Sequence, residues 1–258
     1  MPHSDTDSDT EAAGLDLFTE PADFRPPDKP ATFAQHTLTT GARETLNLRL
    51  VGHNPLWGHM LWHAGRITSE YLEEHAATLI ASKRILELGA GAGLPSLVCA
   101  LRGAARVVVT DYPDPDLVSN LRTNITAVGS PENIVAEGYI WGRDAGELMG
   151  DGGRFDVLVL SDLLFNHSQH GALAETVRVA MKADGVALVF FTPHRPWLLS
   201  EDLAFFKVAE EAGFEVRKVL EKKLEAPMFE EDPGDRELRR TVFGYELRWA
   251  DPGKVQLP

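Results

Sequence analysis

The sequence is poor in cysteine, in basic residues and in long apolar runs. Its one cysteine, Cys99, cannot form an internal disulfide, which excludes a disulfide scaffold and fits a reducing compartment. No apolar run approaches the roughly 20 residues that cross a bilayer. The 25 basic and 39 acidic residues give a net charge of −14 at pH 7, which argues against binding nucleic acid or an anionic membrane through charge.

Metal-binding patterns are also missing. There is no cysteine cluster and no HExxH motif, and the spacing of His59 and His63 stands alone, so the sequence predicts no metal site. The first residues are acidic and polar, which predicts neither a secretory signal nor a transit peptide. We expect a cytoplasmic protein, with nothing against a nuclear pool, and the lack of a heptad pattern favours a monomer.

Acidic residues and prolines are concentrated at the start of the chain. Residues 1–30 hold eight acids, two bases and five prolines, with little periodic apolar pattern. We predict an acidic, partly disordered arm over residues 1–40, irregular to about Ala34, and one folded domain over residues 41–258. In that domain, the alternation of three leucines predicts a half-buried strand over 44–51, and apolar spacing predicts a helix over 67–81.

From residue 84 onward, short apolar runs alternate with helix-like segments. The predicted strands cover 85–88, 106–110, 133–137, 155–161, 186–192, 214–220 and 241–249, and the predicted helices lie near 94–102, 114–127, 169–183 and 200–212. This alternation predicts an α/β fold with a mostly parallel sheet. The last two strands are joined by about twenty residues without a strong helix pattern, so we expect that pair to be antiparallel.

A glycine-rich turn follows the first of these strands. Gly89 and Gly91 let the backbone turn tightly and approach a ligand without a Cβ in the way. Backbone amides at the start of the next helix favour an anionic or carboxylate-bearing group. Asp111 ends the following strand, 111 − 91 = 20 residues after Gly91, where a carboxylate can accept hydrogen bonds from ribose hydroxyls. The pattern predicts a nucleoside-bearing ligand, with a turn that binds nothing as the alternative.

Three neighbours of this turn discriminate between cofactors. The dinucleotide fingerprint G-x-G-x-x-G needs a last glycine where this chain has Leu94 or Ser96, which disfavours a nicotinamide-dinucleotide oxidoreductase. Glu87, two places before the turn, fits an S-adenosylmethionine pocket better. We therefore expect S-adenosyl-L-methionine as the cofactor.

Six segments of the sequence resemble the fungal methyltransferases of elongation factor 1-alpha: GAGAGLPSL, VVVTDYPDPDL, GYIWG, SDLLFNHSQH, FFTPHRPWL and MFEEDPGD. The resemblance covers roughly residues 15–250. It implies a protein N-methyltransferase that modifies the N-terminal amine and the adjacent lysine of elongation factor 1-alpha. It also implies a seven-strand, Rossmann-like class I methyltransferase sheet of order 3-2-1-4-5-7-6, with the last strand antiparallel, which agrees with the strand count above.

The resemblance also implies which residues bind the cofactor. The matching positions are Trp62, Gly89, Ala90, Gly91, Asp111, Trp141 and Ser161. In the family, the glycine turn contacts the methionine portion, the acid binds the ribose, and the second tryptophan lies beside the adenine.

Asp162 is the expected catalytic residue. It follows the fourth strand of the predicted sheet, and the carboxyl ends of such strands face the crevice. A carboxylate there can accept hydrogen bonds from an amine and orient its lone pair for in-line attack. Related lysine methyltransferases carry Asp-x-x-Tyr at this point, whereas this chain has Phe165, so the hydroxyl is missing. We expect Phe165 to shape the substrate channel and Asn166 to supply a polar contact.

Two other functions stay open at this stage. One is transfer to a small heteroaromatic amine such as nicotinamide, and the other is a cofactor-binding interaction module without turnover. The acidic loop around residues 230–235 reads as a solvated loop or, as a sharper hypothesis, as a lip that attracts a basic protein segment. For Trp57 and Trp197 we expect core packing, with a substrate-channel role for Trp197 as the alternative.

Overall fold

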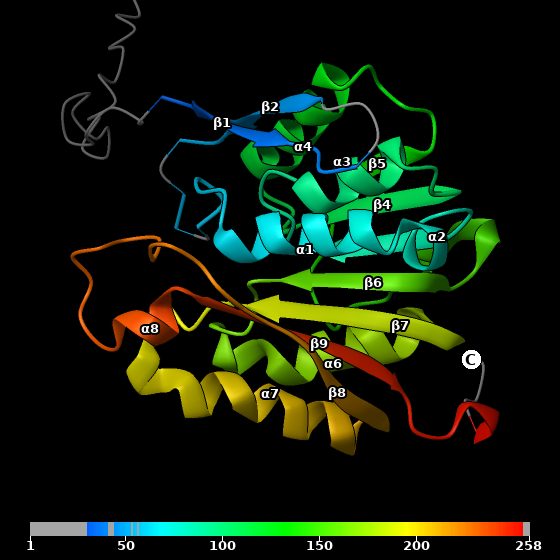
Figure 1. The fold of residues 1–258 in the computed structure, drawn as a ribbon. Coiled ribbons are helices and arrows are strands. Elements are labelled where there is room, and N and C mark those ends of the chain that lie inside the picture. The colour runs from blue at the N-terminus through cyan, green and yellow to red at the C-terminus, as the bar shows by residue number, and fades with distance from the viewer. Residues whose placement is uncertain (1–29, 41–43, 53, 56, 255–258) are drawn as a thin grey trace, which may run out of the picture.

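Short runs of valine, leucine and isoleucine form a central sheet that is buried on both faces. The computed structural model describes residues 30–40, 44–52, 54–55 and 57–254. Within these ranges the sheet has seven strands: β3 (Arg84–Leu88), β4 (Arg106–Asp111), β5 (Ile134–Gly138), β6 (Phe155–Ser161), β7 (Met181–Phe191), β8 (Phe214–Lys223) and β9 (Thr241–Trp249). Their order across the sheet is β5-β4-β3-β6-β7-β9-β8. β9 alone runs opposite to the other six strands of this sheet (Figure 1), which confirms the predicted order and the reversed last strand.

Helices cover both faces of this sheet. The longer ones are α1 (His63–Glu74), α3 (Leu94–Leu101), α4 (Pro115–Ala127), α6 (His170–Ala180) and α7 (Leu199–Glu211). Three helices of four residues each accompany them: α2 (Ala76–Leu79), α5 (Gly146–Met149) and α8 (Arg236–Arg239). Among the described residues, no helix combines the length and the apolar character that a membrane crossing requires.

The side-chain alternation of the strands divides the core into two halves. Ile85 packs with the residues of α1, α3 and α4, whereas the next residue, Leu86, packs with those of α6 and α7. Val107 and Val108 are divided in the same way on β4. The result is a three-layer arrangement, with the sheet between two layers of helices (Figure 1).

A hairpin precedes this domain core. It consists of β1 (Thr32–Thr37) and β2 (Thr45–Leu50), which pair antiparallel. The second strand lies where the leucine alternation predicts it. The first is a difference from the sequence analysis, which expects an irregular chain to about Ala34. Only His36 is buried in β1, so the strand has no apolar alternation to reveal it. Residues 1–29 of the predicted arm lie outside the described residues, and the boundary at residue 40 stays a prediction.

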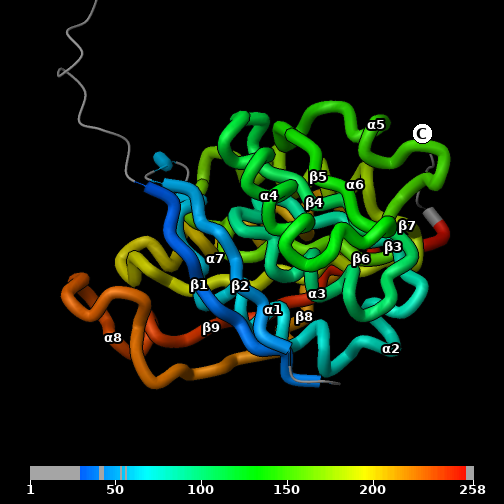
Figure 2. The backbone as a smooth tube through the Cα atoms, turned by 90° about the horizontal axis from the view of Figure 1, so that it is seen from above, coloured from blue at the N-terminus to red at the C-terminus, as the bar shows by residue number. Residues whose placement is uncertain are grey.

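Two buried polar clusters hold the hairpin against the helices. Asn120 and Asn124 on α4 each donate a side-chain hydrogen bond of 2.9 Å to the carbonyl oxygen of Arg49 on β2. At the other end, the Glu73 carboxylate on α1 accepts hydrogen bonds from the Thr39 backbone amide at 2.7 Å and from Arg102. Figure 2 shows the hairpin running along the outside of the molecule beside α1 and α4.

Several element ends differ from the predicted ones. The helix predicted over 67–81 begins four residues earlier, at His63, and is interrupted at His75, whose ring bonds to the Tyr71 carbonyl oxygen at 2.8 Å. The helix predicted to reach residue 183 ends at Ala180, and β7 starts at Met181 opposite a bulge in β6. The segment before β9, which has no strong helix pattern, contains the single turn α8.

Candidate active site

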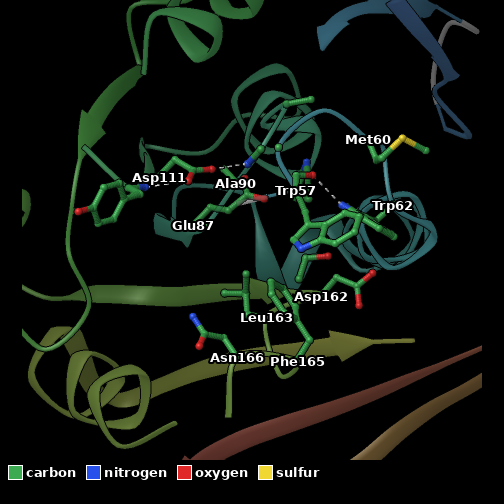
Figure 3. Close-up of a pocket in the computed structure, with 18 of the residues that line it drawn as sticks. Trp57, Met60, Trp62, Glu87, Ala90, Asp111, Asp162, Leu163, Phe165 and Asn166 are labelled. Carbon is green, nitrogen blue, oxygen red and sulfur yellow. Dashed lines mark hydrogen bonds between the residues drawn. The ribbon is translucent and has the colours of Figure 1, made fainter. Parts of the chain in front are cut away.

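A cavity of about 480 Å³ opens at the carboxyl ends of β3, β4 and β6 (Figure 3). Parallel strands place their loops together at this edge, so residues far apart in sequence meet there. All ten residues that the sequence singles out line this one cavity: Trp62, Gly89, Ala90, Gly91, Asp111, Trp141, Ser161, Asp162, Phe165 and Asn166. Their shared location is a finding, and their individual roles stay predictions.

The glycine turn needs glycine at both of its predicted positions. Gly89 and Gly91 have φ angles of +58° and +57°, in the left-handed region that other residues rarely adopt. A Cβ on Gly89 would lie 2.6 Å from a methyl of Leu163 and 3.2 Å from the ring of Trp141. The turn is therefore held close to the opposite wall of the pocket, which leaves no room for a side chain.

Asp111 is fixed by the backbone around it. Its carboxylate accepts hydrogen bonds of 2.7 Å from the amides of Gly91 and Tyr112. Burial raises the pKa of Asp111, and those two amides partly oppose the rise. Each carboxylate oxygen keeps a lone pair for a ligand, so Asp111 can still accept a hydrogen bond from a hydroxyl in the cavity.

Glu87 is a second buried carboxyl beneath the turn. It accepts a hydrogen bond of 2.9 Å from the Ser96 amide at the start of α3, and only 1% of it is exposed. Burial raises the pKa of Glu87 to about 8. In the described structure the group therefore carries a proton at neutral pH, and its hydrogen bond links β3 to α3 just below the pocket floor.

The segment between β2 and α1 forms one wall. Trp62 caps the start of α1 in an extended conformation, and its indole nitrogen donates to the Trp57 carbonyl oxygen at 3.2 Å. The rings of Trp57 and Trp62 lie 6.1 Å apart. Gly58 packs so closely on α4 that a Cβ would lie 2.6 Å from Leu117. This segment carries many of the lining residues, of which only Trp62 is predicted to lie in the pocket.

The expectation of core packing is wrong for Trp57 and Trp197. Trp57 is 48% exposed and lines the cavity, and Trp197 is 56% exposed. Trp197 lies beside Gly234 and outside the cavity lining. A tryptophan next to a glycine, in the loop that precedes α1, is the signal that could have marked Trp57 as a pocket residue.

Asp162 has an uncommon backbone conformation. Its φ angle is +61°, which aspartate and asparagine tolerate better than most residues. Its two carboxylate oxygens contact the Thr192 amide at 3.2 Å and the His194 ring nitrogen Nε2 at 3.0 Å. The imidazole of His194 lies in turn against Trp62, with 4.7 Å between ring centroids. In the view of Figure 3, Asp162 lies below Trp62 and across the pocket from Asp111.

The loop after Asp162 is braced from outside the pocket. Arg195 donates a hydrogen bond of 3.0 Å to the Phe165 carbonyl oxygen, and His167 pairs with Asp202 on α7 at 2.7 Å. Phe165 is 39% exposed and lines the cavity. Asn166 lines the cavity beside it.

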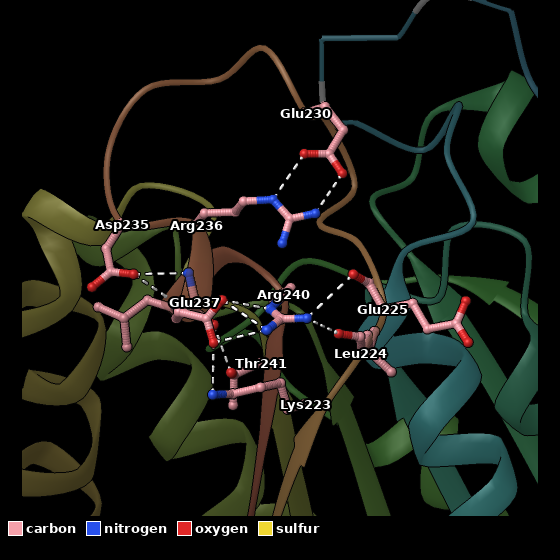
Figure 4. A network of polar contacts seen from close by, with 10 residues as sticks. Lys223, Leu224, Glu225, Glu230, Asp235, Arg236, Glu237, Arg240 and Thr241 are labelled. Atoms are coloured by element: carbon pink, nitrogen blue, oxygen red, sulfur yellow. Dashed lines mark hydrogen bonds and ion pairs between the residues drawn. The ribbon is translucent and has the colours of Figure 1, made fainter.

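The acidic loop between β8 and β9 reaches the same mouth. The ring of Phe229 packs edge-on to Trp62 at 6.1 Å, and Arg239 donates to the Phe229 carbonyl oxygen at 2.6 Å. Figure 4 shows that acidic side chains of this loop pair with basic side chains or backbone amides of the same segment. Glu230 pairs with Arg236, and Asp235 accepts from the first amides of α8.

The donor set of the cavity suits an S-adenosyl nucleoside. The Asp111 carboxylate and the flat ring of Trp141 match a ribose and a purine, and the glycine turn lets a ligand approach the backbone that lines the cavity. Within the described residues, no group of three or more histidine, cysteine or acidic side chains is arranged to hold a metal ion.

Similarity to known proteins extends over most of the chain. The family model described as "lysine methyltransferase" matches residues 42–212. The chain belongs to this family. The protein N-terminal and lysine N-methyltransferase efm7 of Emericella nidulans is 50% identical over 252 residues, which cover 92% of this chain and 96% of that protein. The Schizosaccharomyces pombe protein of the same name is 43% identical over 250 residues, or 93% of this chain and 97% of that one.

Solved structures share the fold of this lysine methyltransferase at low identity. A 16S rRNA N2 methyltransferase of T. thermophilus, in complex with AdoMet and guanosine, matches with a TM-score of 0.57 and 18% identity, covering 87% of this chain and 52% of that chain. The P. horikoshii protein TYW2, in complex with MeSAdo, matches with a TM-score of 0.53 and 16% identity, covering 85% and 72%. The fold is that of a class I methyltransferase, as predicted.

Proposed function

We propose that this lysine methyltransferase uses S-adenosyl-L-methionine to methylate the N-terminal amine and the adjacent lysine of elongation factor 1-alpha. The two kinds of amine are proposed from the names of its relatives, and the protein substrate is proposed from the motif resemblance. The observation that carries the proposal is the single cavity that joins the glycine turn and Asp111 at one end to Asp162 at the other.

The cofactor end would be held by the residues that the resemblance implies. Gly89, Ala90 and Gly91 would bind the methionine portion and Asp111 the ribose. Trp141 would lie beside the adenine. Trp62 and Ser161 complete this end, and the Ser161 hydroxyl is held near Thr68 at 3.2 Å. When bound, S-adenosylmethionine supplies an electrophilic methyl group on a sulfonium centre.

The amine end is built to orient a nitrogen and to exclude water. Asp162 is 9% exposed and aims a carboxylate at the cavity, where it would accept a hydrogen bond from the substrate nitrogen. The rings of Trp62 and Phe165 form apolar walls around that position and would limit water access. Catalysis would then rest on alignment and proton removal, because the methyl donor already carries the leaving group.

The test is transfer of labelled methyl groups from S-adenosylmethionine into a lysate of cells that lack this protein, followed by peptide mass spectrometry. We expect one labelled protein, with label on the amino-terminal peptide of elongation factor 1-alpha. A variant with Gly89→Val, which fills the turn, is the control and should transfer no label. Label only in the small-molecule fraction would replace the proposal with a metabolite methyltransferase, and no label despite cofactor binding would replace it with a binding module.

We further propose that the chain acts as a cytoplasmic monomer.

A further inference from the structure

Asp162 is paired with a histidine that does not line the pocket. The Asp162 carboxylate faces the cavity, whereas His194 lies behind it and contacts it through Nε2 at 3.0 Å. The two side chains are 8% and 22% exposed, so solvent screens the pair only partly. Their contact is therefore an electrostatic feature of the site and not a surface ion pair.

An isolated carboxylate at this position would oppose the proposed reaction. A nearby negative charge favours the protonated form of an amine and typically raises its pKa by one to three units. Free N-terminal amines have pKa values near 8 and lysines near 10.4, so both are already mostly or largely protonated at neutral pH. An ammonium has no lone pair and cannot attack a methyl group. A bare Asp162 would hold the substrate in this unreactive form.

We propose that His194 is a positioning residue that stays cationic and cancels the charge of Asp162, so that the pair accepts the substrate amine in its neutral form. This inference rests on the proposed function. The ammonium gives one proton to water, and its nitrogen keeps the electron pair. That pair forms the new N–C bond while the S–C bond to the methyl group breaks, and the electron pair of the broken bond stays on sulfur. Asp162 then accepts a hydrogen bond from the neutral amine, and neither Asp162 nor His194 gains or loses a proton.

The surroundings of His194 support a positive charge there. Burial opposes the charged ring, but Asp162, Asp202 on α7 and Asp232 in the acidic loop together raise the pKa of His194. The nearest titratable neighbour on α1 is His63, whose pKa is lowered by burial and by His194 itself. The two pKa shifts run in opposite directions, which favours a positive charge on His194, behind Asp162, over one on His63.

The test compares wild type with His194→Gln and His194→Ala across pH 6.5 to 10.5. Glutamine keeps a donor near the Nε2 position and removes the charge, so it separates charge from orientation. We expect both variants to lose about tenfold in kcat at pH 7.5 and to recover above about pH 9.5, because the bound amine titrates at least about one unit higher. KM for the protein substrate should stay constant or fall, since the ammonium binds better.

A binding measurement without the cofactor gives a second readout. Calorimetry of the amino-terminal peptide of elongation factor 1-alpha, in two buffers of different ionisation enthalpy, counts protons released on binding. We expect close to one proton released by wild type at pH 7 and much less by His194→Gln.

Three results would overturn the inference. One is a loss of kcat that is equal at every pH, which would mark His194 as a structural or proton-accepting group. Another is full rescue by glutamine at pH 7.5, which would mean that orientation alone matters. A third is identical proton release by wild type and variant. Failure of wild type itself to label any protein would be distinct, because it overturns the proposed function first.

Discussion

At the scale of single residues, Asp162 joins a backbone constraint to a chemical one. Its left-handed φ of +61° places the residue after β6 in a conformation that aspartate tolerates and that most side chains strain. The same conformation directs the carboxylate into the cavity beside Trp62. Aspartate and asparagine are the side chains that tolerate this backbone conformation best. Of the two, only aspartate carries a charge for His194 to balance.

Asparagine at this position should separate stability from activity. Asp162→Asn keeps the left-handed conformation and loses the carboxylate, so we expect a fall in kcat of about 100-fold or more with little change in melting temperature. Methyl transfer to the amino-terminal peptide and thermal unfolding measure the two effects. Asp156→Asn, at the opposite end of the same strand, is the matched control and should leave kcat unchanged. Full turnover by Asp162→Asn would remove the proposed role.

The raised pKa of Glu87 predicts how the free energy of unfolding depends on pH. Its folded pKa of about 8 lies above the unfolded value of 4.5, so the folded state binds a proton that the unfolded state releases. Stability therefore falls as pH rises from 4.5 to 8. Glu87→Gln removes this titration and should gain about 3 kcal/mol over wild type at pH 7, with no gain at pH 4. Urea unfolding at both pH values tests it, and a gain that does not depend on pH would contradict it.

At the scale of elements, the pocket wall depends on how its two ends are anchored. The segment that carries Trp57 and Trp62 runs from β2 to α1. The β2 end is held through Arg49 and the asparagines of α4. α1 follows the other end, and its buried Glu73 holds the tip of the hairpin. The Glu73 carboxylate is fully buried and pairs with Arg102 at 2.7 Å. This pair connects the tip of the hairpin to α1 and α3.

Removing the charge of Glu73 should loosen the attachment of the hairpin to α1. Breaking a buried ion pair from one side leaves the other charge unbalanced, so we expect Glu73→Gln to lower the free energy of unfolding by about 3 kcal/mol at pH 7. Burial would raise the pKa of Glu73, but its hydrogen bonds to Thr39 and Arg102 outweigh that effect and lower it. The deficit should therefore be complete above pH 4.5 and shrink as pH falls below it. Glu74→Gln, on the exposed side of the same helix, should change stability by less than about 0.5 kcal/mol.

The elements that sequence predicts are those with a strong apolar period. The continuous runs of β4 and β6 predict buried strands of a mostly parallel sheet, and the glycine turn predicts one end of the pocket. The order of the strands comes from the family resemblance. The hairpin strand β1 escapes prediction because polar residues form most of it, and its stability comes from pairing with β2. His194 and Phe229 escape as site residues because they reach Asp162 and Trp62 only through tertiary contacts. Such contacts produce no pattern in the spacing of residues along the chain.

At the scale of the whole molecule, the acidic side chains behind the net charge of −14 differ in whether a basic side chain neutralises them. In the loop at the pocket mouth, Glu230 and Glu237 are neutralised by arginines and Asp235 caps α8 (Figure 4). Glu231 is exposed and forms no ion pair with another described residue. If the loop attracts a basic substrate segment as an acidic lip, we therefore expect Glu231 and its neighbour Asp232 to supply the charge.

Charge reversal at Glu231 tests the lip directly. We expect Glu231→Lys to lower kcat/KM for the protein substrate about threefold at low salt, with the difference lost near 0.5 M salt, because steering by exposed charge is screened. Glu215→Lys makes the same change in net charge at the start of β8, away from the pocket, and should have no such effect. Equal behaviour of the two variants at low salt would remove the lip.

The placement of the tryptophans has a consequence for how the protein can be studied. Three of its five indoles, those of Trp57, Trp62 and Trp141, line the cavity. Intrinsic fluorescence therefore reports mainly on this one region, and a nucleoside that stacks on Trp141 should quench the emission. The molecule carries its own optical probe of occupancy, so titrations can follow binding without a label, an active enzyme or a known acceptor.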